Sequence, residues 1–169
     1  MESFVNYWLA SPALVKFLGH HSWAWTMSEV LHFVGLTLLI GAVGMFDLRM
    51  MGVAKELPVA PLRRLLPWGV LGFVLCVVTG LVFVLGLEAN VPNPIYDVLT
   101  TDTFLQLKLL FIFLAGLNLL AFYLTGVSRA VDLVGPGEDA PPLAKVIAGT
   151  SLFLWVGVIY FGRHIPWGL

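Results

Sequence analysis

The fold is decided by the stretch from Thr26 to Arg49, which reads TMSEVLHFVGLTLLIGAVGMFDLR. Between Val30 and Phe46 its one ionisable side chain is that of His32. An apolar run of about 20 residues crosses a lipid bilayer as a helix. The stretch therefore predicts a membrane span that holds two polar side chains, Glu29 and His32, within its apolar sequence.

Working outward, the chain contains three more runs of this kind. The predicted spans cover residues 23–46, 65–87, 104–127 and 143–165, and short connections rich in proline, glycine and charge separate them. Short connections between successive spans favour an antiparallel four-helix bundle. Residues 4–19 predict a short amphipathic helix that lies on the membrane interface. The sequence thus predicts one all-α integral membrane domain over residues 1–169.

Composition agrees with a membrane protein and excludes other classes. Of the 169 residues, 59% are hydrophobic and 11% are charged, whereas soluble domains average about 25% charged residues. A net charge of −1 gives no basic face for nucleic acid. Cys76 is the only cysteine, which excludes an internal disulfide and a thiolate metal cluster. The N-terminal sequence does not predict a cleavable signal peptide.

The distribution of lysine and arginine predicts the direction of the spans. Six of the nine cations lie on the side of the first and third connections, namely Arg49, Lys55, Arg63, Arg64, Arg129 and Lys145. Cytoplasmic loops carry an excess of these residues. We therefore expect both termini on the periplasmic side of a bacterial inner membrane.

Polar residues within the spans gather in the outer half of the predicted bundle. Ionisable groups at membrane depth face the bundle interior or a cavity, and they mark functional sites. The predicted intramembrane polar network comprises Glu29, His32, Lys108, Asn118 and Arg163. In one interpretation this network is structural: Glu29 and Lys108 form an ion pair that fixes the helix register, and Asn118 makes an interhelical hydrogen bond.

A second interpretation gives the outer residues to one b-type haem. Two histidines at one level on facing helices would ligate its iron, and His21 or His20 with His164 satisfies this requirement between the first and fourth spans. Arg163 would meet a haem propionate. The haem would make the chain a redox component that acts with a periplasmic or membrane partner.

A third interpretation is a copper site, because imidazole suits copper and zinc. Its predicted ligands are His20, His21, Glu29 and His32. No nucleophile–base pair or phosphate-binding loop appears, so no catalytic residue is predicted and a stand-alone enzyme is not favoured. The alternative class is a non-catalytic structural subunit of a larger membrane complex, which fits the small loops and extensive apolar faces.

Three motifs, SEVLHFVGL at residues 28–36, DLRMMG at 47–52 and GRHIPW at 162–167, resemble a family of uncharacterised bacterial inner-membrane proteins with four spans. The resemblance covers nearly the whole chain and implies no activity. The family residues it implies are Glu29, His32, Asp47, Arg49, Lys108, Asn118 and Arg163. A looser likeness to copper-resistance D-type membrane proteins, which carry histidines in the outer halves of their spans, favours metal or haem and a periplasmic partner.

Overall fold

The computed structural model describes residues 11–89 and 95–165. Four helical stretches are long and apolar enough to cross a membrane, which confirms a multi-pass helical architecture at that level. They are α3 (Ser22–Met51), the stretch that joins α4 (Val59–Arg63) to α5 (Leu66–Leu85), α7 (Thr103–Leu124) and α9 (Pro142–Arg163). The described residues contain no strand, in agreement with the predicted all-α class.

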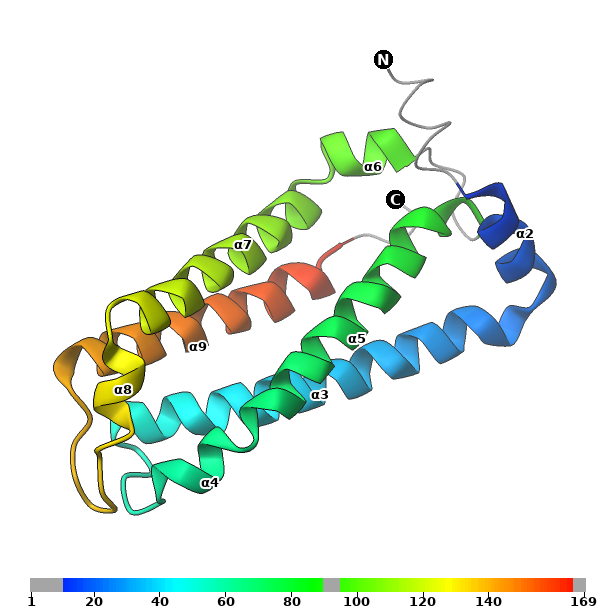
Figure 1. Ribbon diagram of the computed structural model, residues 1–169. Coiled ribbons are helices and arrows are strands. Elements are labelled where there is room, and N and C mark those ends of the chain that lie inside the picture. The colour runs from blue at the N-terminus through cyan, green and yellow to red at the C-terminus, as the bar shows by residue number, and fades with distance from the viewer. Residues whose placement is uncertain (1–10, 90–94, 166–169) are drawn as a thin grey trace.

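Short helices lie at the two ends of these long ones. At one end are α2 (Pro12–His20), the 3₁₀ turn η1 (Leu87–Ala89) and α6 (Ile95–Thr101), and at the other are α4 and α8 (Val127–Val131) (Figure 1). We call these the α2/α6 end and the α4/α8 end. Helix α2 overlaps the predicted segment 4–19 over residues 12–19, and residues 4–10 of that segment lie outside the described part of the chain.

Local chemistry sets the helix boundaries. The Asp102 side chain accepts a hydrogen bond from the Leu105 backbone N–H at 2.9 Å and so caps the start of α7. Pro142 takes the first position of α9, where its missing N–H costs nothing. Gly52, with φ of 89°, ends α3 in a left-handed conformation that favours glycine.

Helix α3 continues to Met51, whereas the predicted span ended at residue 46. The extra turn holds Asp47 and Arg49, whose charges argue for a boundary when they are read from sequence. In the structure both side chains are turned into the protein, since Asp47 is 6% exposed and Arg49 is fully buried. A charged side chain that is buried against protein does not end a helix at the lipid boundary.

The first two spans pack closely at a glycine contact. A Cβ atom at Gly35 would lie 2.8 Å from the Gly72 carbonyl oxygen, and one at Gly72 would lie 2.7 Å from the Leu39 nitrogen. Small residues permit this approach, which supplies the packing contacts that hold membrane helices together. The remaining main contacts between long helices join α7 to α9 and α3 to α9.

The largest cluster of buried apolar side chains lies toward the α4/α8 end. Its members come from α3, α4, α7, α8, the loop before α9, and α9: Phe46, Met50, Val59, Leu62, Phe122, Val127, Val131, Ala140, Ala144 and Ala148. Five of its members also line a cavity beside Asp47, namely Phe46, Met50, Phe122, Ala144 and Ala148.

Candidate functional site

Asp47 is a buried carboxyl with an unused oxygen. It lies in the next-to-last turn of α3 and is 6% exposed. Its Oδ2 has no hydrogen-bond partner, whereas the other buried side-chain nitrogen and oxygen atoms of the described residues each have one. Leaving such an atom unsatisfied costs about 1–3 kcal/mol, and more when the group is charged. A buried oxygen without a hydrogen-bond partner therefore calls for a functional explanation.

Asp47 lines a cavity of about 300 Å³ between the long helices α3, α5, α7 and α9. This volume lies at the lower end of the range for small-molecule sites, about 300–1,000 Å³. Most of the lining is apolar, and five of its side chains are aromatic: Phe46, Phe73, Phe122, Tyr123 and Trp155. An apolar cavity with few polar groups is typical of a binding site for a small organic molecule.

Two further polar side chains line the same cavity. The hydroxyl of Ser151 in α9 lies within hydrogen-bonding reach of the Asp47 carboxyl. The Asn118 amide Nδ2 donates to the Ile147 backbone oxygen at 3.0 Å, which confirms the predicted interhelical hydrogen bond between α7 and α9. Asp47, Ser151 and Asn118 thus bring polar groups from three helices to one apolar cavity.

The cavity is open on the side of α5 and α7. Its lining residues there are exposed, as shown by Val70 (61%), Leu119 (56%) and Tyr123 (53%). On the side of α3 and α9 the lining is closed by buried residues such as Met50 and Ala144. Figure 1 shows α5 and α7 running apart from one another. Both helices are long and apolar enough to cross a membrane.

Arg49 fixes the end of α3 that carries Asp47. Its guanidinium donates from Nε to the Leu57 oxygen at 2.6 Å, from Nη2 to the Gly135 oxygen at 2.8 Å and from Nη1 to the Glu138 oxygen at 3.3 Å. The arginine thereby joins α3 to both loops at the α4/α8 end. Three carbonyl partners explain how a fully buried cation is tolerated there.

Four residues of the predicted polar network, Glu29, His32, Lys108 and Arg163, do not line this cavity. Glu29 is exposed, and its Oε1 accepts a hydrogen bond from Trp25 Nε1 at 3.0 Å. Arg163 is the exposed last residue of α9. The ion pairs among the described residues join Arg63 to Asp132 and Lys145 to Asp139. The predicted pair of Glu29 with Lys108 is not among them.

His32 and Lys108 each lie close to a residue of another long helix. The His32 Nδ1 lies 2.7 Å from the Thr79 hydroxyl, which itself donates to the Leu75 oxygen at 2.7 Å, so α3 and α5 are joined by a polar contact. The Lys108 Nζ lies 3.4 Å from the position of a Cβ at Gly162, in the last turn of α9. The carbonyl end of a helix favours a nearby cation.

The rings of the other three histidines form hydrogen bonds with backbone oxygens of their own helical segments. The Nδ1 atoms of His20, His21 and His164 lie 2.7, 3.0 and 2.8 Å from the backbone oxygens four residues earlier. Phe17 stacks on His21, whereas His164 packs on Tyr160 and Phe104.

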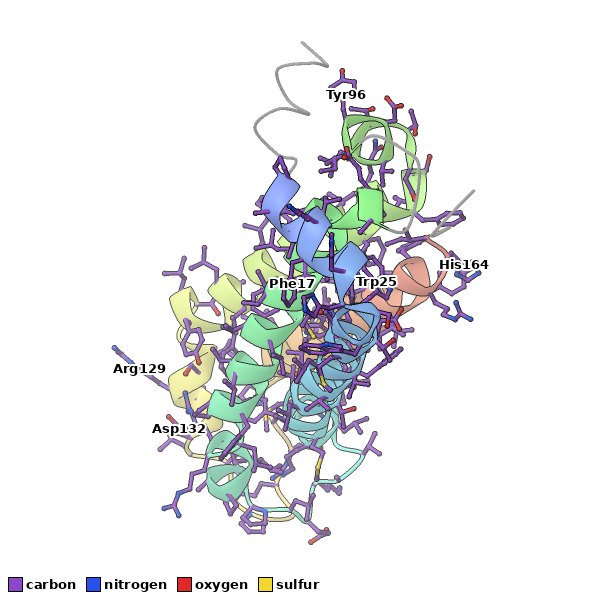
Figure 2. The ribbon with its side chains drawn as sticks, turned by 90° about the vertical axis from the view of Figure 1, so that its right-hand side faces the viewer. Phe17, Trp25, Tyr96, Arg129, Asp132 and His164 are labelled. Atoms are coloured by element: carbon purple, nitrogen blue, oxygen red, sulfur yellow. The ribbon has the colours of Figure 1, made fainter. Side chains whose placement is uncertain are left out.

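The predicted haem ligands come from two segments, the junction of α2 with α3 and the end of α9. Phe17 and His164 lie apart in Figure 2, and the start of α3 lies away from the end of α9 in Figure 1. No group of three or more His, Cys, Asp or Glu side chains in residues 11–89 and 95–165 is placed to hold a metal ion. The haem and copper assignments therefore stay predictions.

Sequence reasoning did not place Asp47 in a site. The residue lies beside Arg49 in the motif DLRMMG, which predicts a local contact at the end of a span. One sequence signal points toward the site: a hydroxyl in an apolar span, such as that of Ser151, is suited to a polar partner on a neighbouring helix. In the structure Ser151 and Asp47 line the same cavity. Comparison with protein-family models, with curated proteins and with solved structures finds no match for this chain.

Proposed function

We propose that this chain is a multi-pass membrane protein that binds a small lipid-soluble molecule between its long helices, with Asp47 as the polar anchor. The observation that carries the proposal is the unpartnered Asp47 Oδ2 beside a cavity of about 300 Å³. A hydrogen-bond donor or a cationic group of a ligand would interact with this oxygen, while the apolar lining would contact the rest of the molecule.

The open side of the cavity supports a ligand that arrives through the lipid. The exposed lining residues Val70 and Leu119 are apolar and belong to α5 and α7. In a bilayer these side chains face acyl chains, so a molecule dissolved in the membrane would reach Asp47 between the two helices without crossing water. Binding would then be coupled to partition into the membrane.

The orientation belongs to the same proposal. We infer an antiparallel bundle in a bacterial inner membrane, with the α4/α8 end in the cytoplasm and α2 on the outer interface. Exposed cations at the α4/α8 end, Lys55, Arg64 and Arg129, support this direction. Asp47 would lie in the cytoplasmic half of the membrane, below the level of His32.

Mass spectrometry of an organic extract of the purified protein tests the binding function. Gly116 lines the cavity, and a Cβ at this position meets no atom within 4 Å. Gly116→Phe therefore puts a ring into the mouth of the cavity without a backbone clash. We expect the wild-type protein to retain a small molecule in a fixed ratio and Gly116→Phe to lose most of it.

Gly41→Phe is the matched control. Gly41 is an exposed glycine of α3 with equally open space around its Cβ position, and it does not line the cavity. We expect this variant to keep the bound molecule. Extracts of all three proteins that differ only in bulk lipid and detergent would contradict the proposed function.

A redox or metal-handling role with a partner protein is a second candidate, and one observation favours it. Each outer histidine engages its Nδ1 with a backbone oxygen, which leaves Nε2 as the open ligand atom. The absorption spectrum of the purified protein, oxidised and then reduced, tests for haem, and elemental analysis tests for copper. A featureless spectrum with no stoichiometric copper or zinc would leave a structural subunit as the alternative.

A further inference from the structure

Asp47 shares its cavity with an unusual number of aromatic rings. Phe73 of α5 and Trp155 of α9 meet edge to face with their centroids 6.2 Å apart, and Phe46 and Phe122 meet likewise at 5.9 Å. Both pairs line the cavity, as does Tyr123. The cavity therefore offers π-faces and ring edges from all four long helices around one carboxyl group.

We infer that the ligand is a lipophilic organic cation, such as a quaternary ammonium or a protonated amine on an apolar body. This inference rests on the proposed function and names the chemical class of its ligand. Aromatic rings attract cations through their quadrupoles, and rings that surround a quaternary ammonium are the usual protein site for it. The Asp47 carboxylate supplies the opposite charge.

Charge balance within the protein supports this choice over a neutral ligand. The nearest arginine in sequence, Arg49, is committed to three backbone oxygens. The ion pairs in the described residues use Asp132 and Asp139, both outside the long helices, and leave Asp47 without a cationic partner. A buried carboxylate that lacks a counter-charge is costly. A cationic ligand compensates this cost on binding, which a neutral molecule of the same shape does not.

The shape of the cavity restricts the size and the approach of the cation. A volume of about 300 Å³ accommodates one ring with a small charged head. The head would reach Asp47 on the closed side, while the apolar body would lie toward Val70 and Leu119 at the opening. A larger amphiphile would keep its tail in the lipid between α5 and α7.

Two ligands of matched shape test the inference: benzyltrimethylammonium and neopentylbenzene, in which carbon replaces the charged nitrogen. Their dissociation constants are measured from thermal unfolding of the full chain in phosphatidylcholine nanodiscs, because a ligand of the folded state raises the melting temperature. We expect Asp47→Asn to weaken the cation about tenfold or more and to change the neutral ligand by less than about twofold.

Glu29→Gln is the matched control, since it removes an exposed carboxyl from the same helix. We expect it to leave the affinities for both ligands unchanged. Trp155→Leu provides a second variant if Asp47→Asn does not fold. It removes the ring type that binds cations best, and we expect a loss of about fivefold for the cation with a smaller change for the neutral ligand.

The outcomes separate the two claims. Two results would overturn the cationic class of the ligand and still support the binding cavity. In the first, neopentylbenzene binds the wild-type protein and benzyltrimethylammonium does not. In the second, benzyltrimethylammonium binds Asp47→Asn as tightly as it binds the wild-type protein. If neither ligand binds the wild-type protein, and Gly116→Phe also leaves the extracted molecules unchanged, the proposed function fails together with the inference.

Discussion

Asp47 and Arg49 are two residues apart in α3, yet the arginine donates to the backbone oxygens of Leu57, Gly135 and Glu138 and not to the carboxyl of Asp47. The two buried charges therefore have separate tasks. Arg49 ties the end of the helix to both loops, and Asp47 keeps an oxygen free beside the cavity. The opposite stability effects of replacing them follow from this division.

Arg49→Met should lower the free energy of unfolding by about 3 kcal/mol or more. The change leaves three carbonyl oxygens without their donor, and each buried unsatisfied group costs about 1–3 kcal/mol. Arg129→Met is the control, because Arg129 projects away from the protein in Figure 2. Equal unfolding curves in mild detergent for the two variants would show that the Arg49 hydrogen bonds do not hold the loops.

Asp47→Leu should instead raise the free energy of unfolding of the ligand-free protein, by about 1–3 kcal/mol. It replaces a buried carboxyl that has one unpartnered oxygen with an apolar side chain beside an apolar cavity, and such replacements are often stabilising. Glu88→Leu, at an exposed carboxyl outside the long helices, should change stability by about 0.5 kcal/mol or less. Destabilisation by Asp47→Leu would mean that a protein group satisfies Oδ2 as well.

Gly72→Ala should separate α3 from α5. The added Cβ would press on the Gly35 carbonyl oxygen and on the Leu39 nitrogen, and backbone atoms have little freedom to move. Overpacking of this kind costs about 1–3 kcal/mol. Gly41→Ala meets open space and should leave stability unchanged or slightly higher. A melting temperature of Gly72→Ala at the wild-type level would show that the helices are not in close contact there.

The span positions could be predicted from the sequence because each depends on the hydropathy of about 20 neighbouring residues. The predicted span 104–127 and helix α7, for example, share their start to within one residue. The packing role of the glycines is harder to read from sequence: Gly35 and Gly72 lie at the contact of α3 with α5, whereas Gly41 and Gly116 meet open space. The difference depends on which face of a helix meets a neighbour, which hydropathy does not record.

The candidate site could not be predicted in the same way. Glu29 and His32 attract attention because they interrupt an apolar run, but one is exposed and the other is bonded to Thr79. Asp47 sits beside Arg49 in sequence, where a local ion pair is the natural expectation. Only the contacts of Arg49 with Leu57 in the next loop, and with Gly135 and Glu138 in the distant loop before α9, reveal that the carboxyl lacks that partner.

The loop pair of Asp139 with Lys145 should make a small contribution to stability that depends on pH. The hydrogen bond from Lys145, at 3.1 Å, and then its charge lower the pKa of Asp139. A lowered pKa in the folded state stabilises above the unfolded value, about 3.9, and this stabilisation is lost as pH falls through the folded value. Asp139→Asn should therefore melt slightly below the wild type at pH 7 and together with it near pH 2. A difference that persists at low pH would contradict the pairing.

Cysteine labelling should reveal the direction of the spans. In a Cys76→Ala background, Lys55→Cys should resist an impermeant maleimide added to intact cells, while Thr100→Cys in α6 should react. Both positions are exposed, so access depends on the side of the membrane. Labelling of Lys55→Cys alone would invert the proposed orientation, since the excess of positive charge would then face outward.

The most direct measurement is a crystal structure of the chain grown from a lipid phase with its bound molecules retained. The account predicts non-protein density in the cavity between α3, α5, α7 and α9, with one atom within about 2.7–3.2 Å of Asp47 Oδ2 or a charged nitrogen within about 4 Å. Density for water alone, or a cavity closed by Phe73 and Trp155 with Asp47 Oδ2 bonded to the protein, would contradict it.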